Sequence, residues 1–396
     1  MDTVIFSDDQ HLKLVHNGLN IRLNGRLNTA NQVINGFLHV DSSSTKVTLT
    51  RTPQAKRTQT IVPPLPYYSE EVFFYNKDST RLAGTLTTPK QGDSFAAVVL
   101  VSGSGPQDRN SEILGHKPFE ILADHLTRKG IAVLRYDDRG YGASHGQFRP
   151  ATTLDYTYDA LAAVNFLKTH PTQKFNKIGI IGHSEGGNIA PVAATMDSSV
   201  NFIVLLAAPG LSNYDFYLIS LDLIMQETPE TYDRDFPFFK SVYKDMATID
   251  DKEILKDSLQ RKFASIVLQM SEEELIPFNG ADAYVKSMVA YHTSDWYHYF
   301  LQFDVTPYLE KLTIPILALN GDQDTSVEAA ANLRGIQQIL ERSGNNNFEV
   351  VPLKNVNHFF QESKDAKIES VYFNEITFSR EALVKIEKWI QQRVQN

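Results

Sequence analysis

Apolar runs alternate with helix-like patterns over most of the chain. Residues 154–168 and 380–394 carry apolar side chains at helical spacing and predict two helices. The apolar runs predict strands near residues 70–76, 81–87, 95–101, 131–136, 177–183, 201–207, 314–319 and 347–352. Strands that alternate with helices favour a mostly parallel sheet with helices on both faces. Only four residues separate the first two strands, so we expect this pair to be antiparallel. The pattern predicts an α/β fold with an eight-stranded sheet.

The first 60 residues follow a different pattern, in which short strand-like runs are separated by turn signals. We interpret Asn24-Gly25 and Asn35-Gly36 as hairpin turns, so residues 1–60 are predicted to form a β-rich segment. Residues 61–66 contain three prolines, which favour an extended linker, although an ordinary loop is the alternative. Residues 67–396 are then the α/β domain.

Residues 210–307 interrupt the alternation of strands and helices. This stretch is helix-like and rich in aromatic residues, and it predicts a helical cap inserted into the α/β domain. The aromatic rings could line a substrate pocket, but for most of them we favour burial in the core of the cap itself.

Composition narrows the class of protein. The chain has 396 residues, 42% hydrophobic content, a formal net charge of -9 and no cysteine. These values favour a soluble protein without a nucleic-acid footprint, and no apolar run is long enough to span a membrane. The first nine residues lack the features of a secretory signal, so the compartment stays open between cytoplasmic and exported. The oligomeric state is equally open, and a homodimer through an exposed edge of the N-terminal strands is one option.

Residues 182–187 carry the most informative motif. They read Gly-His-Ser-Glu-Gly-Gly, follow a predicted strand and precede a predicted helix, so Ser184 lies at a strand-to-helix corner between Gly182 and Gly186. The glycines suit a strained turn that lifts the serine hydroxyl clear of the sheet. Ser184 is therefore the candidate nucleophile.

A serine hydroxyl needs a histidine base and a carboxylate that orients it. His358 follows one late strand, and Asp322 and Asp324 follow another, where open parallel sheets place functional groups. Serine, acid, histidine is the expected chain order, and His358 is our candidate base. Chemistry alone allows either aspartate. For His183 we expect a packing or turn role, because the turn should direct its side chain elsewhere.

An acyl-transfer site also needs backbone donors for an oxyanion. We expect the amides of Ser104, in the loop of residues 102–106, and of Glu185 to supply them. A phosphate-binding loop is the rival interpretation, but the pattern GxxxxGK[ST] is missing and Pro106 removes a donor. No histidine and carboxylate cluster has metal-ligand spacing and no GxGxxG follows a strand, so we expect no metal and no cofactor.

Taken together, the motifs at 101–109, 134–140, 182–187 and 357–361 resemble those of the bacterial α/β-hydrolase superfamily, in its esterase and serine-aminopeptidase-like branch with a helical cap. The likeness covers about residues 66–396. Its acid loop commonly reads GxxDxxV, which Gly321, Asp324 and Val327 match, and this favours Asp324 over Asp322. Residues 1–60 resemble the end of a β-rich N-terminal domain and suggest a truncated module.

We therefore expect a serine hydrolase that acts on small-molecule carboxylic esters with short to medium acyl groups. Ser184 would attack, His358 would transfer the proton, and Asp324 would orient His358. A peptidase or aminopeptidase-like amide hydrolase is the nearest alternative, and a non-catalytic binding protein on the same scaffold is a further one.

Overall fold

The structure is a computed structural model, which describes residues 3–7, 10–16, 21–30, 32–40, 43–50, 56–92, 94–363 and 368–394. Contacts between residues group the chain into two compact units. The larger comprises residues 55–243 and 295–396, and the smaller comprises residues 1–54 and 244–294. The boundary predicted at residues 61–66 stays a prediction, although these residues form neither helix nor strand.

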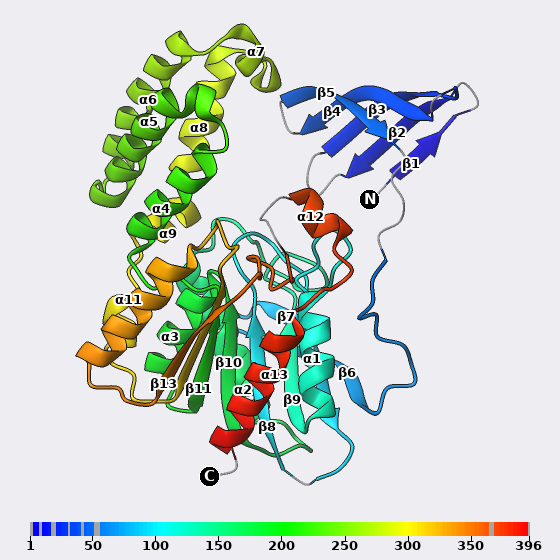
Figure 1. Cartoon of the computed structure of the whole chain (residues 1–396), viewed down its shortest axis with the longest axis vertical. Coiled ribbons are helices and arrows are strands. Elements are labelled where there is room, and N and C mark those ends of the chain that lie inside the picture. The colour runs from blue at the N-terminus through cyan, green and yellow to red at the C-terminus, as the bar shows by residue number, and fades with distance from the viewer. Residues whose placement is uncertain are drawn as a thin grey trace. The chain divides into compact units, whose positions relative to one another are not determined.

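The larger unit is built on a sheet that has eight strands in the described part of the chain, as predicted (Figure 1). The strands are β6 (Tyr67–Tyr75), β7 (Arg81–Pro89), β8 (Phe95–Val101), β9 (Ile131–Tyr136), β10 (Phe175–His183), β11 (Val200–Leu206), β12 (Ile316–Gly321) and β13 (Phe348–Leu353). Their order is β13-β12-β11-β10-β8-β9-β7-β6. The pairs β6–β7 and β7–β9 are antiparallel and the other neighbouring pairs are parallel.

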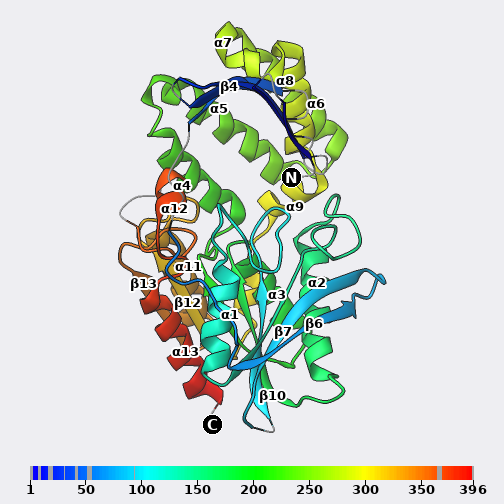
Figure 2. The ribbon, with the colours of Figure 1, turned by 90° about the vertical axis from the view of Figure 1, so that its right-hand side faces the viewer.

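Helices cover both faces of this sheet. Helices α1 (Pro118–Arg128) and α13 (Arg380–Val394) lie on one face, and α2 (Thr153–Lys168) and α3 (Gly186–Met196) lie on the other (Figure 2). Helix α11 (Ala329–Arg342) packs on β12 and β13. The two helices predicted from apolar spacing are α2 and α13, and both are confirmed. The apolar face of α13 buries Ile386 and Trp389 against the sheet, where Trp389 meets Phe202 of β11 edge to face.

The stretch between β11 and β12 is helical, as predicted. Its helices are α4 (Asn213–Met225), α5 (Pro229–Thr248), α6 (Lys252–Ile266), η2 (Val267–Gln269), α7 (Glu272–Leu275), η3 (Ile276–Phe278), α8 (Ala281–His292), α9 (Asp295–Gln302) and α10 (Thr306–Leu309). The larger unit holds α4, most of α5, α9 and α10, whereas residues 244–294 belong to the smaller unit, where α6 packs on α8. Helix α12 (Ile368–Phe373) precedes α13. Within the described ranges, no helix is long and apolar enough to cross a membrane.

The N-terminal strands form an antiparallel sheet with the order β1-β2-β3-β4-β5 in the described residues. The strands are β1 (Thr3–Phe6), β2 (His11–His16), β3 (Ile21–Asn28), β4 (Val33–Val40) and β5 (Ser43–Thr50). The prediction of hairpin turns at the two Asn-Gly pairs was wrong. Asn24-Gly25 lies inside β3, and Asn35-Gly36 lies inside β4.

The two glycines that misled the turn prediction face each other across β3 and β4. Gly25 pairs with Gly36, and a Cβ atom added to Gly36 would lie 2.4 Å from the Cα of Gly25. Glycine inside a strand often marks such a close approach of backbones. The glycines therefore serve strand pairing here, and the chain reverses between Asn28 and Val33.

Candidate active site

Ser184 lies in a strained turn between β10 and α3, the arrangement that its motif predicted. Its φ angle is +53°, a left-handed value that costs a side-chain-bearing residue free energy. The flanking glycines make the turn possible. A Cβ atom on Gly182 would lie 2.0 Å from the carbonyl oxygen of Gly186, and one on Gly186 would lie 2.4 Å from that of Val101. The turn exists only because both positions lack a side chain.

Asp324 and His358 are joined by a hydrogen bond at the ends of adjacent strands. The Nδ1 atom of His358 lies 2.8 Å from Oδ2 of Asp324, whose side chain is fully buried. The other carboxylate oxygen accepts the backbone amides of Ser326 and Val327, each at 2.8 Å. These three contacts fix the carboxylate, and the carboxylate in turn fixes the plane of the imidazole.

Asp322 lies in the same loop, but its side chain bonds the backbone of another turn. Its Oδ1 atom accepts the backbone amide of Asn355 at 2.7 Å. That bond ties the loop after β12 to the turn after β13. The structure therefore brings Asp324, and not Asp322, to the imidazole.

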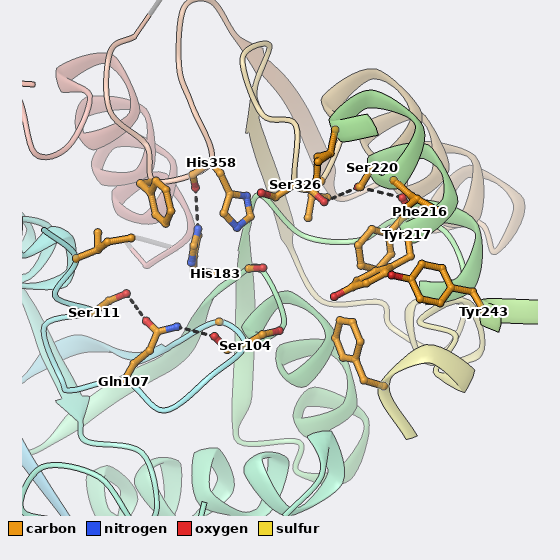
Figure 3. A pocket seen from close by; sticks show the side chains of 18 of the residues that line it. Ser104, Gln107, Ser111, His183, Phe216, Tyr217, Ser220, Tyr243, Ser326 and His358 are labelled. Atoms are coloured by element: carbon orange, nitrogen blue, oxygen red, sulfur yellow. Dashed lines mark hydrogen bonds between the residues drawn. The ribbon is translucent and has the colours of Figure 1, made fainter. Parts of the chain in front are cut away.

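Ser184 and His358 line one cavity of about 490 Å³ in the larger unit. Figure 3 shows polar side chains on one side of this cavity, including those of Ser104, Gln107 and His183. On the other side we define an aromatic wall, which consists of Phe216, Tyr217, Tyr243 and Phe300. The ring of Tyr217 lies 5.0 to 5.8 Å from those of the other three. Phe216, Tyr243 and Phe300 are also buried, so these rings both pack in the insertion and line the cavity. The prediction of burial concerned most rings of the insertion and left room for some that line a pocket.

His183 also lines the cavity, contrary to the expectation that the turn would direct it elsewhere. Its Nε2 atom donates a hydrogen bond to the carbonyl oxygen of His358 at 2.8 Å, and the two rings lie 4.8 Å apart. Burial, together with the nearby His358, lowers the pKa of His183 to about 4. His183 is therefore neutral near pH 7, and its ring packs against the backbone that carries His358.

The 102–106 loop, which follows β8, lies directly against Ser184. A Cβ atom on Gly103 would lie 3.0 Å from that of Ser184. Asp138 is buried two residues after β9. It accepts the Ser102 hydroxyl at 2.7 Å and the backbone amide of Gln107, the residue after the loop, at 2.8 Å, so it holds the loop at both ends. Burial raises the pKa of Asp138 to about 8.

The sequence drew attention only to the backbone amide of Glu185, but its side chain is also part of the site. It is 2% exposed and accepts the Thr153 hydroxyl at 2.6 Å and the Trp296 indole nitrogen at 3.1 Å. The Ser104 side chain is a further hydrogen-bonding partner. Burial raises the pKa of this carboxyl group, and these hydrogen bonds oppose the rise. A carboxylate next to a candidate nucleophile was visible in the sequence, but its partners were not.

The sheet, its helical layers and the strained serine turn define an α/β hydrolase. Residues 115–362, more than half of the chain, match the family described as serine aminopeptidase, S33, and the chain belongs to this family. It is therefore a hydrolase of the α/β-hydrolase class.

Three similar proteins come from different organisms. Esterase EstD of Thermotoga maritima is 25% identical over 328 residues, which are 82% of this chain and 70% of EstD. The polyketide transferase af380 of Aspergillus fumigatus is 36% identical over 107 residues, covering 25% of this chain and 35% of that protein. The solved structure of the Pyrococcus furiosus esterase Pf2001 shares the fold, with a TM-score of 0.51, 15% identity and coverage of 86% of this chain and 98% of that one.

Proposed function

We propose that this protein is a serine carboxylesterase that cleaves esters of short to medium acyl groups through Ser184, His358 and Asp324. The observation that carries the proposal is the buried Asp324–His358 hydrogen bond at the cavity that Ser184 also lines. Similarity to esterase EstD over most of the chain supports ester hydrolysis as the activity.

The proposed reaction passes through an acyl-enzyme. The Ser184 hydroxyl attacks the ester carbonyl carbon while Nε2 of His358 takes its proton. The carbonyl oxygen becomes an oxyanion, which accepts hydrogen bonds from the amides of Ser104 and Glu185. The tetrahedral intermediate then breaks its bond to the alkoxy oxygen, which leaves as the alcohol with the proton from His358. A water molecule then gives a proton to His358 and attacks the acyl carbon. The bond between that carbon and Oγ of Ser184 breaks, His358 returns the proton to Oγ, and the carboxylic acid leaves.

The hydrogen bonds that Asp324 and His183 make with His358 suit this proton transfer. Asp324 accepts from Nδ1, which leaves Nε2 free to take the serine proton. His183 holds the backbone carbonyl of His358 from the other side. Asp324 thus holds the imidazole and His183 holds the backbone that carries it before substrate binds, so little reorganisation is needed during the reaction.

The lining of the cavity favours an ester over an aminoacyl amide. The aromatic wall offers an apolar surface to an acyl group. An aminopeptidase must bind a substrate ammonium, and Glu112 is the one carboxylate among the described residues that line the cavity. Its side chain is 45% exposed and already lies 3.7 Å from the ammonium of Lys117, and solvent weakens any ion pair that it would form with a substrate ammonium.

Replacement of the serine tests the proposal. We expect Ser184→Ala to abolish hydrolysis of p-nitrophenyl butanoate, because alanine keeps the turn but has no hydroxyl. Ser343→Ala is the matched control, since the Ser343 hydroxyl donates to the Leu340 carbonyl at the end of α11, outside the cavity. Undiminished turnover by Ser184→Ala would refute the mechanism.

Two further measurements separate the alternative functions. A panel of esters and aminoacyl p-nitroanilides should show much faster cleavage of the esters, whereas faster cleavage of the anilides would favour an aminopeptidase. A fluorophosphonate probe should label the wild type and leave Ser184→Ala unlabelled. An unlabelled wild type would indicate a non-catalytic binding protein.

A further inference from the structure

The Glu185 side chain joins three parts of the larger unit that are distant in the sequence. Its carboxyl group contacts Thr153 at the start of α2, Trp296 in α9, and the side chain of Ser104 in the 102–106 loop. The indole nitrogen of Trp296 lies 3.1 Å from both carboxylate oxygens. This one side chain therefore connects the loop that faces Ser184 with a helix of the insertion.

The contact with Trp296 extends to the aromatic wall. The Trp296 ring stacks on that of Phe300, one helical turn later, with centroids 5.2 Å apart. Phe300 lines the cavity, and its carbonyl oxygen accepts the Asn213 amide at 2.7 Å. The position of this wall residue is thus set by α4 through Asn213 and by Glu185 through Trp296.

The charge of Glu185 is compatible with a place beside a developing oxyanion. The ion pairs found among the described residues do not include it, and burial raises its pKa. A raised pKa reduces the negative charge that this group would place near the reacting carbonyl oxygen. Hydroxyl and indole partners also satisfy the group without a cation, as a buried polar group requires.

We propose that the Glu185 side chain is a positioning residue, which holds the 102–106 loop and the aromatic wall in one fixed arrangement and thereby sets the preference for acyl length. The inference rests on the proposed esterase function. An acyl group that reaches Phe300 benefits from the arrangement, whereas an acetyl group depends mainly on the loop at Ser184. The substrates that profit are esters with an extended apolar acyl group.

Steady-state kinetics on two esters test this inference. We would measure kcat and KM for p-nitrophenyl acetate and p-nitrophenyl hexanoate, with enzyme concentrations set by active-site titration so that inactive protein does not count. For Glu185→Ala we expect kcat to fall with both esters, and the hexanoate-to-acetate ratio of kcat/KM to fall by roughly tenfold, the effect of one lost hydrogen bond to a buried charged or polar group.

Two further variants and one control variant separate a positioning role of Glu185 from a general loss of structure. Glu185→Gln should keep the ratio within a few-fold of wild type, because its amide oxygen still accepts from Trp296. Trp296→Phe keeps an aromatic ring but loses the indole donor, and it should lower the ratio in the same direction as Glu185→Ala. Glu387→Ala is the control for loss of a buried glutamate, since Glu387 bonds His125 away from the cavity and should leave the ratio unchanged.

The outcomes distinguish this inference from the proposed function. A wild type that cleaves both esters, with an unchanged ratio in Glu185→Ala, would overturn the inference and leave the esterase proposal intact. If Glu185→Ala does not fold, an unchanged ratio in Trp296→Phe would overturn it instead. A wild type that cleaves neither ester would refute both.

Discussion

Asp322 and Asp324 show how strongly the role of a residue depends on its partners. Both are aspartates of one loop, yet Asp324 faces His358 and Asp322 accepts the amide of Asn355. If Asp324 selects the working tautomer of His358, the loss of its charge should reduce catalysis far more than the loss of charge at Asp322.

We therefore expect Asp324→Asn to lower kcat by roughly a thousandfold or more, with little change in KM. Asparagine keeps the shape of the side chain but favours the wrong tautomer of the imidazole. Asp322→Asn should stay within a few-fold of wild type. Both variants are measured with p-nitrophenyl butanoate, and a larger loss in Asp322→Asn would reverse the assignment of the acid.

Candidate site residues could be predicted from the sequence where a local motif or a preceding apolar run marks their position. Ser184 stands in a recognisable turn, and Asp324 and His358 follow strands whose apolar runs are easy to see. The contacts of Glu185 lack any such signal. Thr153 lies 32 residues before it and Trp296 lies 111 residues after it, so only the folded chain reveals that they meet.

At the scale of elements, α4 and α9 supply most of the aromatic wall. Helical spacing and aromatic content predicted helices in this region, but not which rings would face the cavity and which would be covered. Phe300 and Tyr297 on the same helix are equally buried, yet Phe300 lines the cavity, whereas Tyr297 does not and packs against Tyr217 and Trp296. That distinction depends on how α9 packs against α4.

Shortening one ring of the wall should change substrate preference. We expect Tyr217→Ala to enlarge the cavity and to shift the best acyl length upward by several carbons, with a several-fold gain in the decanoate-to-butanoate ratio of kcat/KM. Tyr75→Ala is the control, because Tyr75 is exposed on β6 and does not line the cavity. An unchanged chain-length profile in Tyr217→Ala would show that the acyl group binds elsewhere.

The misinterpreted Asn-Gly pairs illustrate a second limit at this scale. Asn-Gly favours tight turns in general, but glycine also permits two strands to approach closely. Local sequence does not separate these uses. The facing of Gly25 and Gly36 follows from the register of β3 and β4, a property of the pair of strands.

For the molecule as a whole, the pKa values of two neighbouring aspartates are shifted in opposite directions, and each shift makes the free energy of unfolding depend on pH. Burial raises the pKa of Asp138 from its ordinary value of 3.8 to about 8. Burial also acts to raise the pKa of Asp137, but the hydrogen bonds from Arg109 and from the Ala143 amide, together with the charge of Arg109, outweigh it and lower the value. The folded protein thus holds a proton on Asp138 that the unfolded chain releases above about pH 4.

This proton makes the free energy of unfolding fall as pH rises between about 4 and 8, by at most about 1.4 kcal/mol per pH unit for one group. Asp138→Asn carries no titrating proton, and its amide can still bond Ser102 and the Gln107 amide. We therefore expect a flatter dependence on pH, measured by urea unfolding at pH 5 and pH 8. Burial also raises the pKa of Glu185, which likewise lowers the free energy of unfolding as pH rises. The Asp138→Asn variant should therefore keep part of the pH dependence.

Asp137→Asn is the matched control for this experiment. A lowered pKa stabilises the fold above 3.8 and loses that contribution only as pH falls through the lowered value. The variant should therefore be less stable than wild type by the same amount at pH 5 and pH 8, with an unchanged slope. A slope in Asp138→Asn equal to that of the wild type would show that Asp138 is ionised in the folded protein.

The left-handed backbone at Ser184 has a consequence for laboratory evolution. Glycine adopts a φ angle of +53° without the steric cost that serine bears, so glycine at position 184 would relieve strain in the turn while removing the hydroxyl. Heat resistance and turnover therefore select opposite residues at this position. A library screened for survival at high temperature alone would enrich inactive protein, and every round of such a screen would need a direct assay of ester cleavage.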